Sequence, residues 1–304
     1  MNTAQRTVGP QTSLYAIFGS PIRHAMSPVI QNSAFARHGL DAVMIALEAD
    51  TDSFEELFAP LKKADNFKGF VFTMPVKTLA MRFMDDVSPE AAIIGATNCA
   101  ARGDEGRLTA YNTDSIGFWT SVRARCGADE TIDSAFIMGA GGMARAAIAQ
   151  LALQGVRRIT VANRAEDKSF IADLEAFGKR LRRHCPDVSL ELIGWEPSEW
   201  SRFTEDAKLI ANCSANGMNG KGDLDRTFPF SSVRDDAVFC EAVYEPLETP
   251  FIIKAGELGH RTVHGIELLT HQGANAFFKW TGIHADPELM QSDIENYRAS
   301  IGRS

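Results

Sequence analysis

Short apolar runs alternate with amphipathic segments in the first third of the chain. Residues 14–18, 42–47 and 69–73 are short and apolar, which predicts three buried strands. Residues 28–38 and 53–63 lie between them and have the apolar spacing of helices that bury one face. Because strand and helix alternate, we expect a parallel sheet covered by helices.

A second series of apolar runs begins near residue 135. Its strands are expected at residues 135–138, 158–162, 190–193, 209–212 and 237–243. Between the two series, residues 103–106 predict a hairpin turn, and Asn112-Thr113-Asp114 precedes a helix over 115–125 with Asp114 as its N-cap. We place the first domain boundary here. Helices are also expected at 266–280 and 287–298, so the pattern predicts an α/β protein whose second domain is a doubly wound, nucleotide-binding sheet.

Composition and charge narrow the classes of partner. The 304 residues carry a formal net charge of -8 and contain no dense Lys/Arg stripe, which disfavours nucleic acid. Five scattered cysteines include no C-x-x-C pair, which predicts no metal site and a reducing, cytoplasmic compartment. Residues 1–11 are polar and no apolar run approaches about 18 residues, so we expect neither a signal peptide nor a membrane span.

A glycine-rich turn follows the run at 135–138. Gly139-Ala140-Gly141-Gly142-Met143-Ala144 fits the G-x-G-x-x-G/A pattern and leads into an alanine-rich helix. Glycines let a pyrophosphate approach the backbone, and the helix N-terminus offers N–H groups to it. The simpler explanation is a turn that only permits close helix packing. Its place between a buried strand and a helix favours a dinucleotide site.

The residues after the next strand bear on the choice of cofactor. Asn163 and Arg164 stand where NAD-binding proteins place an acidic residue, and Lys168 follows. Cationic side chains suit the 2′-phosphate of NADP, which we therefore prefer. Glu166 and Asp167 could instead accept from a ribose hydroxyl, so NAD stays open, and a solvated helix start would account for the same charges.

Lys77 and Asp114 are the candidate catalytic residues. Alone, each has an ordinary explanation, a surface lysine and a helix N-cap. Both follow expected strand ends, however, and the carboxyl ends of strands face the ligand crevice in open α/β sheets. A lysine there can exchange a proton with a substrate oxygen while an aspartate orients it.

These motifs together resemble the shikimate dehydrogenase family over nearly the whole chain. The matching pieces are Gly19-Ser20-Pro21-Ile22-Arg23-His24, Ser27-Pro28 with Asn32, Thr73-x-Pro75-x-Lys77, Gly95-Ala96-Thr97-Asn98, Asn112-Thr113-Asp114, Gly139 to Ala144, Asn163-Arg164, Asn212 with Gly217-Met218, Tyr244-x-Pro246 with Thr249-Pro250, and Gly265 with Gln272. Each is a modest signal, but their common order and spacing make the resemblance specific.

The resemblance implies a reaction and a division of the chain. It implies reversible NADP(H)-dependent hydride transfer between 3-dehydroshikimate and shikimate, with Lys77 as general acid/base and Asp114 as its partner. It further implies that residues 1–114 and 266–304 bind the ring acid and that a Rossmann domain of residues 115–265 binds the cofactor, with the C-terminal helices returning to the first domain. The implied substrate-binding residues are Ser27, Thr73, Asn98, Asp114, Tyr244 and Gln272. The implied cofactor-binding residues are Gly139, Ala140, Gly141, Gly142, Met143, Asn163, Arg164, Lys168 and Gly265.

Departures from the family pattern leave the substrate open. Ala25 stands where the family has a serine that grips the substrate carboxylate. A hydrogen bond to a charged acceptor contributes roughly 1.5–3 kcal/mol, or about 10- to 150-fold in affinity. The other departures are Thr97, Cys99, Ser115, Ala165 and Glu241.

Two further functions therefore stay open beside shikimate dehydrogenation. One is a paralogue that acts on quinate or another cyclic hydroxy acid, with NAD as a second cofactor option. The other is a non-catalytic dinucleotide or metabolite sensor, against which the retention of Lys77 and Asp114 argues. The oligomeric state is open as well, a homodimer among the options.

Overall fold

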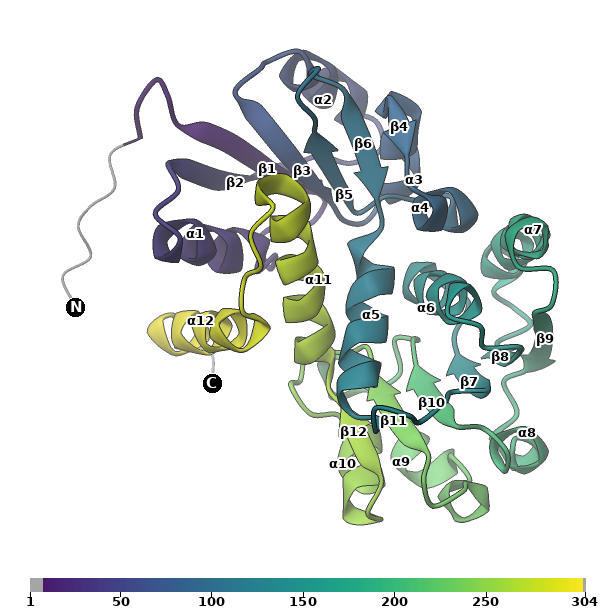
Figure 1. Ribbon diagram of the computed structural model, residues 1–304. Helices are drawn as coiled ribbons and strands as arrows, with labels where there is room; N and C mark the ends of the chain where they lie inside the picture. Colours follow the sequence, from purple (N-terminus) through teal and green to yellow (C-terminus); the bar gives the residue numbers. More distant parts are fainter. Residues whose placement is uncertain (1–7, 303–304) are drawn as a thin grey trace. The chain divides into compact units, whose positions relative to one another are not determined.

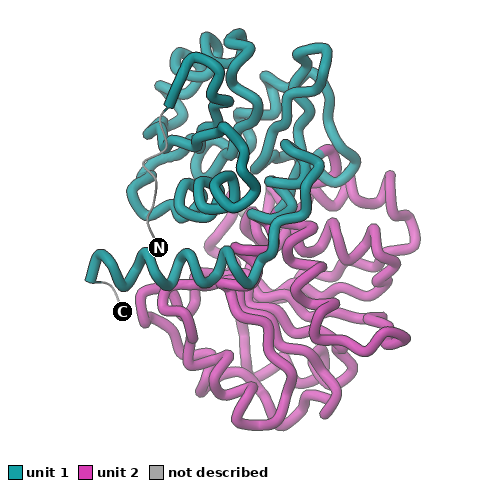
Figure 2. Tube along the Cα trace, turned by 60° about the vertical axis from the view of Figure 1, so that its left-hand side comes forward, with its two compact units in different colours: residues 1–91, 95–113, 273–304 teal, residues 92–94, 114–272 magenta. Residues whose placement is uncertain are grey.

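The computed structural model describes residues 8–302, which form two compact units (Figure 2). Unit 1 contains residues 1–91, 95–113 and 273–304, and unit 2 contains residues 92–94 and 114–272. Residues 1–7, part of the polar N-terminus on which the targeting prediction rests, lie outside the described residues. Within the described part of the chain, no helix is long and apolar enough to cross a bilayer.

Unit 1 is built on a six-stranded mixed sheet in the order β2-β1-β3-β5-β6-β4 (Figure 1). Its strands are β1 (Ser13–Gly19), β2 (Ala42–Glu48), β3 (Phe67–Phe72), β4 (Asp86–Val87), β5 (Cys99–Arg102) and β6 (Leu108–Tyr111). β1 pairs in parallel with β2 and β3, as the alternation of strands and helices predicts. The expected turn at 103–106 joins the antiparallel pair β5 and β6. β4 was not predicted, because two residues carry no periodicity.

The helices of unit 1 pack an aromatic core. They are α1 (Ser27–Arg37), α2 (Phe54–Lys62), α3 (Lys77–Ala80) with the 3₁₀ turn η1 (Met81–Phe83), and α4 (Pro89–Ile94), of which residues 92–94 are grouped with unit 2. Phe54 and Phe58 of α2 meet Phe18, Phe70 and Phe72 of the sheet, and all five side chains are fully buried. Burial of each phenylalanine contributes roughly 1.5–3 kcal/mol to stability. The cluster therefore holds in place the end of the sheet at which β3 leads into α3.

The C-terminal helices complete unit 1. They are α11 (Gly265–Thr281), whose second part from residue 273 belongs to this unit, and α12 (Pro287–Ser300). Arg37 of α1 forms a two-pronged ion pair with Asp293 of α12 at 2.9 and 2.7 Å. Trp280 donates from Nε1 to the Ala100 carbonyl, and a Cβ at Gly69 would lie 2.4 Å from that nitrogen. The predicted return of the C-terminal helices is thus confirmed, and it begins at residue 273 rather than 266 because α11 extends through both units.

Unit 2 is a doubly wound parallel sheet, as predicted, in the order β12-β11-β10-β7-β8-β9 (Figure 1). Its strands are β7 (Ser134–Met138), β8 (Arg158–Asn163), β9 (Ser189–Gly194), β10 (Leu209–Asn212), β11 (Val238–Glu241) and β12 (Arg261–Val263). Every pair is parallel. The strand order reverses between β7 and β10, which is where ligands bind in such sheets.

Besides the first part of α11 and residues 92–94 of α4, unit 2 contains the helices α5 to α10. Their bounds are α5 (Thr113–Ala124), α6 (Gly142–Leu153), α7 (Lys168–His184), α8 (Ser201–Thr204), α9 (Leu224–Thr227) and α10 (Pro250–Glu257), and the 3₁₀ turns are η2 (Pro197–Glu199), η3 (Met218–Gly220) and η4 (Phe230–Ser232). Trp200 lies fully buried in the core with Phe136, Phe228 and Phe239. This core holds the carboxyl ends of the strands in fixed register.

Candidate active site

In unit 1, a tight turn connects the end of β3 to Lys77. Thr73 N–H donates to the Phe18 carbonyl at 2.8 Å, and Val76 N–H donates back to the Thr73 carbonyl at 3.0 Å. A Cβ at Gly19 would lie 2.3 Å from Thr73 Cγ2, so only glycine lets β1 pass this turn. Lys77 then opens α3 and is half-buried. The turn therefore holds Thr73 and Lys77 four residues apart at the carboxyl end of β3.

Asn98 links the Lys77 turn to the start of α5. Thr97 N–H donates to the Lys77 carbonyl at 3.1 Å. Asn98 Oδ1 accepts from Thr113 N–H at 2.6 Å, and Asn98 Nδ2 donates to Thr113 Oγ1 at 3.0 Å. Unit 1 thus fixes the backbone of Lys77 and the residue that precedes Asp114 in one hydrogen-bonded frame.

The same frame corrects the expected role of Asp114 as N-cap. α5 begins at Thr113, so Asp114 lies inside its first turn. The acceptor for the first helical N–H is supplied by Asn98, from a different segment of the chain. Asn98 thus satisfies the first N–H of α5, a cap that the sequence interpretation had assigned to Asp114. A carboxylate in the first turn is still favoured by the helix dipole.

The first turn of α1 carries the predicted carboxylate site. Ser27 is the first residue of α1 and is buried, with 7% of its surface exposed. Ala25 lies two residues earlier. Its backbone N–H donates to the Ile22 carbonyl at 2.9 Å, and its methyl side chain has no donor to offer. Ala25 therefore places no hydroxyl beside Ser27. Thr97 is another departure from the family pattern, and its hydroxyl donates to the carbonyls of Cys99 and Tyr111 at 2.8 and 2.7 Å.

In unit 2, α5 packs against the first part of α11 and so brings Asp114 and Gln272 onto adjoining helices. A Cβ at Gly117 would lie 2.7 Å from Gln272 N and 2.9 Å from its Cβ. Arg125 at the other end of α5 binds Glu267 at 2.6 Å. Glycine at position 117 therefore permits a close helix contact that was not predicted. Gln272 itself is 8% exposed and donates from Nε2 to the Leu269 carbonyl.

Tyr244 belongs to the same unit. Burial raises the pKa of the Tyr244 hydroxyl, and the charges of Glu245 and Asp114 raise that pKa further. The Tyr244 hydroxyl therefore stays protonated and able to donate a hydrogen bond. A Cβ at Gly265, the first residue of α11, would lie 2.2 Å from the Val243 carbonyl, so Gly265 abuts the backbone that leads into Tyr244.

The glycine turn after β7 has the form that a pyrophosphate requires. Gly139 has a positive φ of 102°, and a Cβ there would lie 3.0 Å from the Cys213 carbonyl oxygen. Gly141 is the N-cap of α6 and makes no side-chain cap. A Cβ at Gly141 or Gly142 would meet nothing within 4 Å, so the outer side of the turn is open. This open turn at a helix N-terminus fits the phosphates of a dinucleotide.

Two cations follow the adjoining strand. Asn163 ends β8, is buried, and donates from Nδ2 to the Arg164 carbonyl at 3.1 Å. Arg164 is exposed, and Lys168 opens α7 and is exposed too. A guanidinium and an ammonium in this position fit a phosphate on the adenosine ribose better than a bare ribose hydroxyl. No cluster of His, Cys, Asp and Glu within the described residues could hold a metal ion.

A buried carboxylate at the end of β11 ties three segments of unit 2 together. Glu241 accepts from Asn212 Nδ2 at 2.9 and 3.0 Å, from Val243 N–H at 2.9 Å, and from Thr249 Oγ1 at 2.7 Å. Burial, the largest effect, raises its pKa from 4.5 to about 7. In the sequence, Glu241 stands out only as a departure from the family pattern, because its three partners lie up to 29 residues away.

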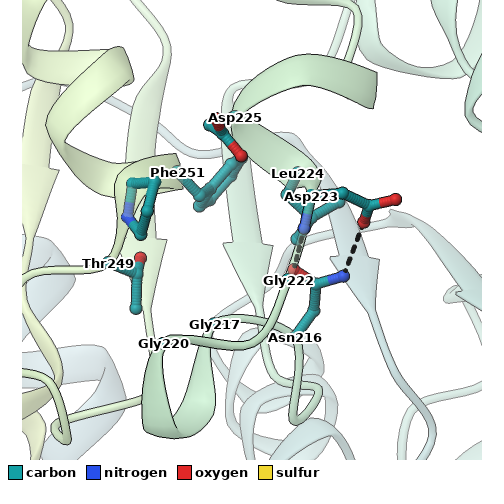
Figure 3. A pocket seen from close by; sticks show the side chains of 10 residues that line it. Asn216, Gly217, Gly220, Gly222, Asp223, Leu224, Asp225, Thr249 and Phe251 are labelled. Carbon is teal, nitrogen blue, oxygen red and sulfur yellow. Dashed lines mark hydrogen bonds between the residues drawn. The ribbon is translucent and has the colours of Figure 1, made fainter.

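Beside this carboxylate lies a small cavity lined by Asn216, Gly217, Asp223 and Thr249, among other residues (Figure 3). Its volume is about 10 Å³, which holds no more than a water molecule. Asn216 closes one side through hydrogen bonds with Asp223 at 3.0 and 3.3 Å. This cavity is too small for a ring acid or a nucleotide, so it is not a candidate binding site.

Comparisons with known protein sequences find similarity to shikimate dehydrogenases. The family model for the shikimate dehydrogenase substrate binding domain matches residues 17–100, and the one for the shikimate 5'-dehydrogenase C-terminal domain matches residues 265–292. A shikimate dehydrogenase (NADP(+)) of Geobacter sulfurreducens is 34% identical over 285 residues, 92% of this chain and 95% of that protein.

Solved structures agree with the sequence comparison. The shikimate 5-dehydrogenase of Listeria monocytogenes, in complex with shikimate and NAD, superposes with a TM-score of 0.87 at 29% identity, covering 96% of this chain and all of that one. A 5-ketofructose reductase of a Gluconobacter strain superposes with a TM-score of 0.80 at 26% identity, covering 95% of this chain and all of that one. The same fold therefore serves more than one substrate.

Proposed function

Because this chain belongs to the shikimate dehydrogenase family, we propose that it interconverts shikimate and 3-dehydroshikimate with NADP(H). The proposal is supported by sequence identity over nearly the whole length of such an enzyme. The observation that carries it is the Asn98 frame, which fixes the backbone of Lys77 and the residue before Asp114. A protein that only sensed a metabolite would not need both side chains.

The proposed chemistry needs a proton carrier for the ring oxygen. When bound, NADP⁺ supplies the acceptor for the hydride that leaves the carbinol carbon. Lys77 takes up the hydroxyl proton as that carbon becomes a ketone, and returns it in the reverse direction. Asp114 orients the Lys77 ammonium and stabilises its charge. We assign these two roles on the family resemblance and on the retention of both residues.

The remaining roles concern binding. For the ring acid we propose contacts from Ser27, Thr73, Asn98, Asp114, Tyr244 and Gln272. Ser27 and Asn98 are polar and buried, and the Tyr244 hydroxyl stays a donor, which suits recognition of hydroxyl and carboxylate oxygens. For the cofactor we propose Gly139, Ala140, Gly141, Gly142, Met143, Asn163, Arg164, Lys168 and Gly265. The open glycine turn supports a dinucleotide, and the exposed Arg164 supports NADP in particular.

Ala25 favours a second candidate function. The missing hydroxyl weakens the expected grip on the shikimate carboxylate, so quinate or another cyclic hydroxy acid is the alternative substrate, and NAD the alternative cofactor. Initial rates with shikimate and quinate, each with NADP⁺ and NAD⁺, test both candidates. The first proposal predicts the highest kcat/KM for shikimate with NADP⁺. If millimolar shikimate gives no turnover, that proposal is wrong.

We also propose that the protein works in a reducing compartment such as the cytoplasm. All five cysteines are free thiols, which fits that environment. Burial raises the pKa of Cys213 and of Cys240, so both stay protonated and unreactive.

A further inference from the structure

The carboxyl ends of β8 and β9 place two residues of unit 2 side by side. These strands are parallel, and their last paired residues are Asn163 and Gly194. Arg164 follows the first and Trp195 follows the second. The Arg164 guanidinium carbon lies 5.6 Å from the centre of the Trp195 ring, over its face. The guanidinium that is proposed to meet the cofactor therefore rests on an aromatic ring.

Trp195 is in turn fixed to the core of unit 2. It is partly buried, and its ring forms a T-shaped pair with the Trp200 ring, with ring centres 5.2 Å apart and an interplanar angle of 81°. Trp200 is fully buried and donates from Nε1 to the Gly194 carbonyl at 3.2 Å. The core thus holds Trp200, Trp200 holds both Trp195 and the end of β9, and Trp195 supports Arg164.

We infer that Trp195 is a positioning residue that holds the Arg164 guanidinium in place for a phosphate on the adenosine ribose, and thereby sets the preference for NADP over NAD. This inference rests on the proposed function, because that function makes Arg164 a cofactor contact. It adds a residue that acts on the cofactor only through Arg164.

The cation–π contact leaves Arg164 suited to this task. The Trp195 ring offers the guanidinium a π face but no oxygen or nitrogen acceptor, so Trp195 does not occupy the N–H donors of Arg164. No described residue accepts a hydrogen bond from the Arg164 side chain, so these donors remain available to a phosphate. An exposed arginine samples many rotamers, and the ring restricts them before the ligand arrives. Cation–π contacts of this kind change affinity by about 3- to 10-fold.

The test uses the full chain and two small probes that differ in a single phosphate, adenosine 2′,5′-bisphosphate and AMP, with binding measured by calorimetry. In Trp195→Ala we expect the preference for the bisphosphate to fall by about 3- to 10-fold, with a parallel rise in the KM ratio of NADP⁺ to NAD⁺. Trp195→Phe, which keeps a ring, should restore most of the preference. Trp195→Leu, which keeps apolar volume without a π face, should behave like alanine.

Two controls separate positioning from general loss of packing. Phe203 is also partly buried against this core and carries Arg202 over its ring at 4.6 Å, but it follows no strand end, so Phe203→Ala should leave the preference unchanged. In an Arg164→Ala background, Trp195→Ala should cause no further loss, because the two residues act in series. Additive losses, an equal loss for AMP, or an unchanged preference in both Trp195→Ala and Trp195→Leu would overturn the inference.

The binding readout keeps this inference separate from the proposed reaction. If the wild-type protein prefers the bisphosphate and Trp195→Ala loses that preference, the inference stands even when no ring acid is oxidised. If the wild-type protein does not prefer the bisphosphate over AMP, the inference is wrong even when a ring acid is oxidised with NAD⁺.

Discussion

Asn98 accepts a 2.6 Å hydrogen bond from the backbone N–H of Thr113, and this contact joins the segment between α4 and β5 to the first turn of α5. Both residues are buried, so no solvent can replace the acceptor. The side chain of Asn98 is thus a helix cap supplied from 15 positions earlier in the chain. Its substitution tests the frame that holds the proposed catalytic residues.

We expect Asn98→Ala to lower the free energy of unfolding by about 1–3 kcal/mol, because a buried N–H loses its acceptor. Asn98→Asp keeps the acceptor but loses the Nδ2 donor to Thr113 and buries a carboxylate, so it should recover only part of that loss. Urea denaturation of both variants beside the wild type gives the comparison. Equal stability of Asn98→Ala and wild type would show that Thr113 finds another partner.

Gly117→Ala tests the approach of α5 and α11 in unit 2. The new Cβ would lie 2.7 Å from Gln272 N, so the helices must separate or Gln272 must move. We expect a loss of about 1–3 kcal/mol in stability and a raised KM for the ring acid. Gly178→Ala on α7 is the matched control, because its Cβ meets nothing closer than 3.5 Å and helix propensity should make it neutral or slightly stabilising. An unchanged KM in Gly117→Ala would remove Gln272 from the proposed site.

Glu241 gives the protein a pH-dependent stability. Its folded pKa of about 7 lies above the ordinary 4.5, so the folded state binds the proton more tightly than the unfolded state does. The Glu241 contribution is therefore fully present below pH 4.5 and is lost as the pH rises through 7, by about 3 kcal/mol. Glu241→Gln should lack this loss, whereas Glu191→Gln on exposed β9 should keep it.

Denaturation at several pH values between 4.5 and 7.5 measures the effect. The difference between wild type and Glu241→Gln isolates this one carboxyl, because every other ionisable group is common to both proteins. A constant difference across this range would mean that Glu241 is ionised throughout.

Ala25→Ser tests whether the missing hydroxyl at position 25 weakens the use of shikimate as substrate. A restored hydroxyl adds one donor to a carboxylate, so kcat/KM for shikimate should rise by about 10- to 150-fold. Ala36→Ser, at an exposed position of helix α1, is the control and should change nothing. If Ala25→Ser leaves shikimate unchanged while quinate or another acid is the better substrate in both proteins, the second candidate function is favoured.

The sequence predicted those parts of the fold that depend on local patterns. The strand of residues 69–73 and the turn at 103–106 were predicted because a few neighbouring residues are enough to recognise an apolar run or a turn. β12 was missed, since three residues carry too little periodicity. The doubly wound sheet of unit 2 was predicted from the succession of strands and helical segments and from the glycine turn after its first strand, and the observed strand order agrees.

Contacts between distant segments could not be predicted in the same way. The cap of α5 was assigned to Asp114 because a sequence shows only the neighbours of Thr113, whereas the acceptor is Asn98. The support of Arg164 by Trp195 depends on the register of β8 and β9 and on a tryptophan five residues further on. Gly117 matters only because α11 passes beside it.

The most direct test of the central proposal is NADPH formation from shikimate and NADP⁺ by wild type, Lys77→Ala and Lys68→Ala, the last at an exposed position of β3. We predict turnover by wild type and Lys68→Ala, and a kcat lowered by about 10²- to 10⁴-fold in Lys77→Ala with little change in the KM for NADP⁺. Wild-type turnover that persists undiminished in Lys77→Ala would contradict the account.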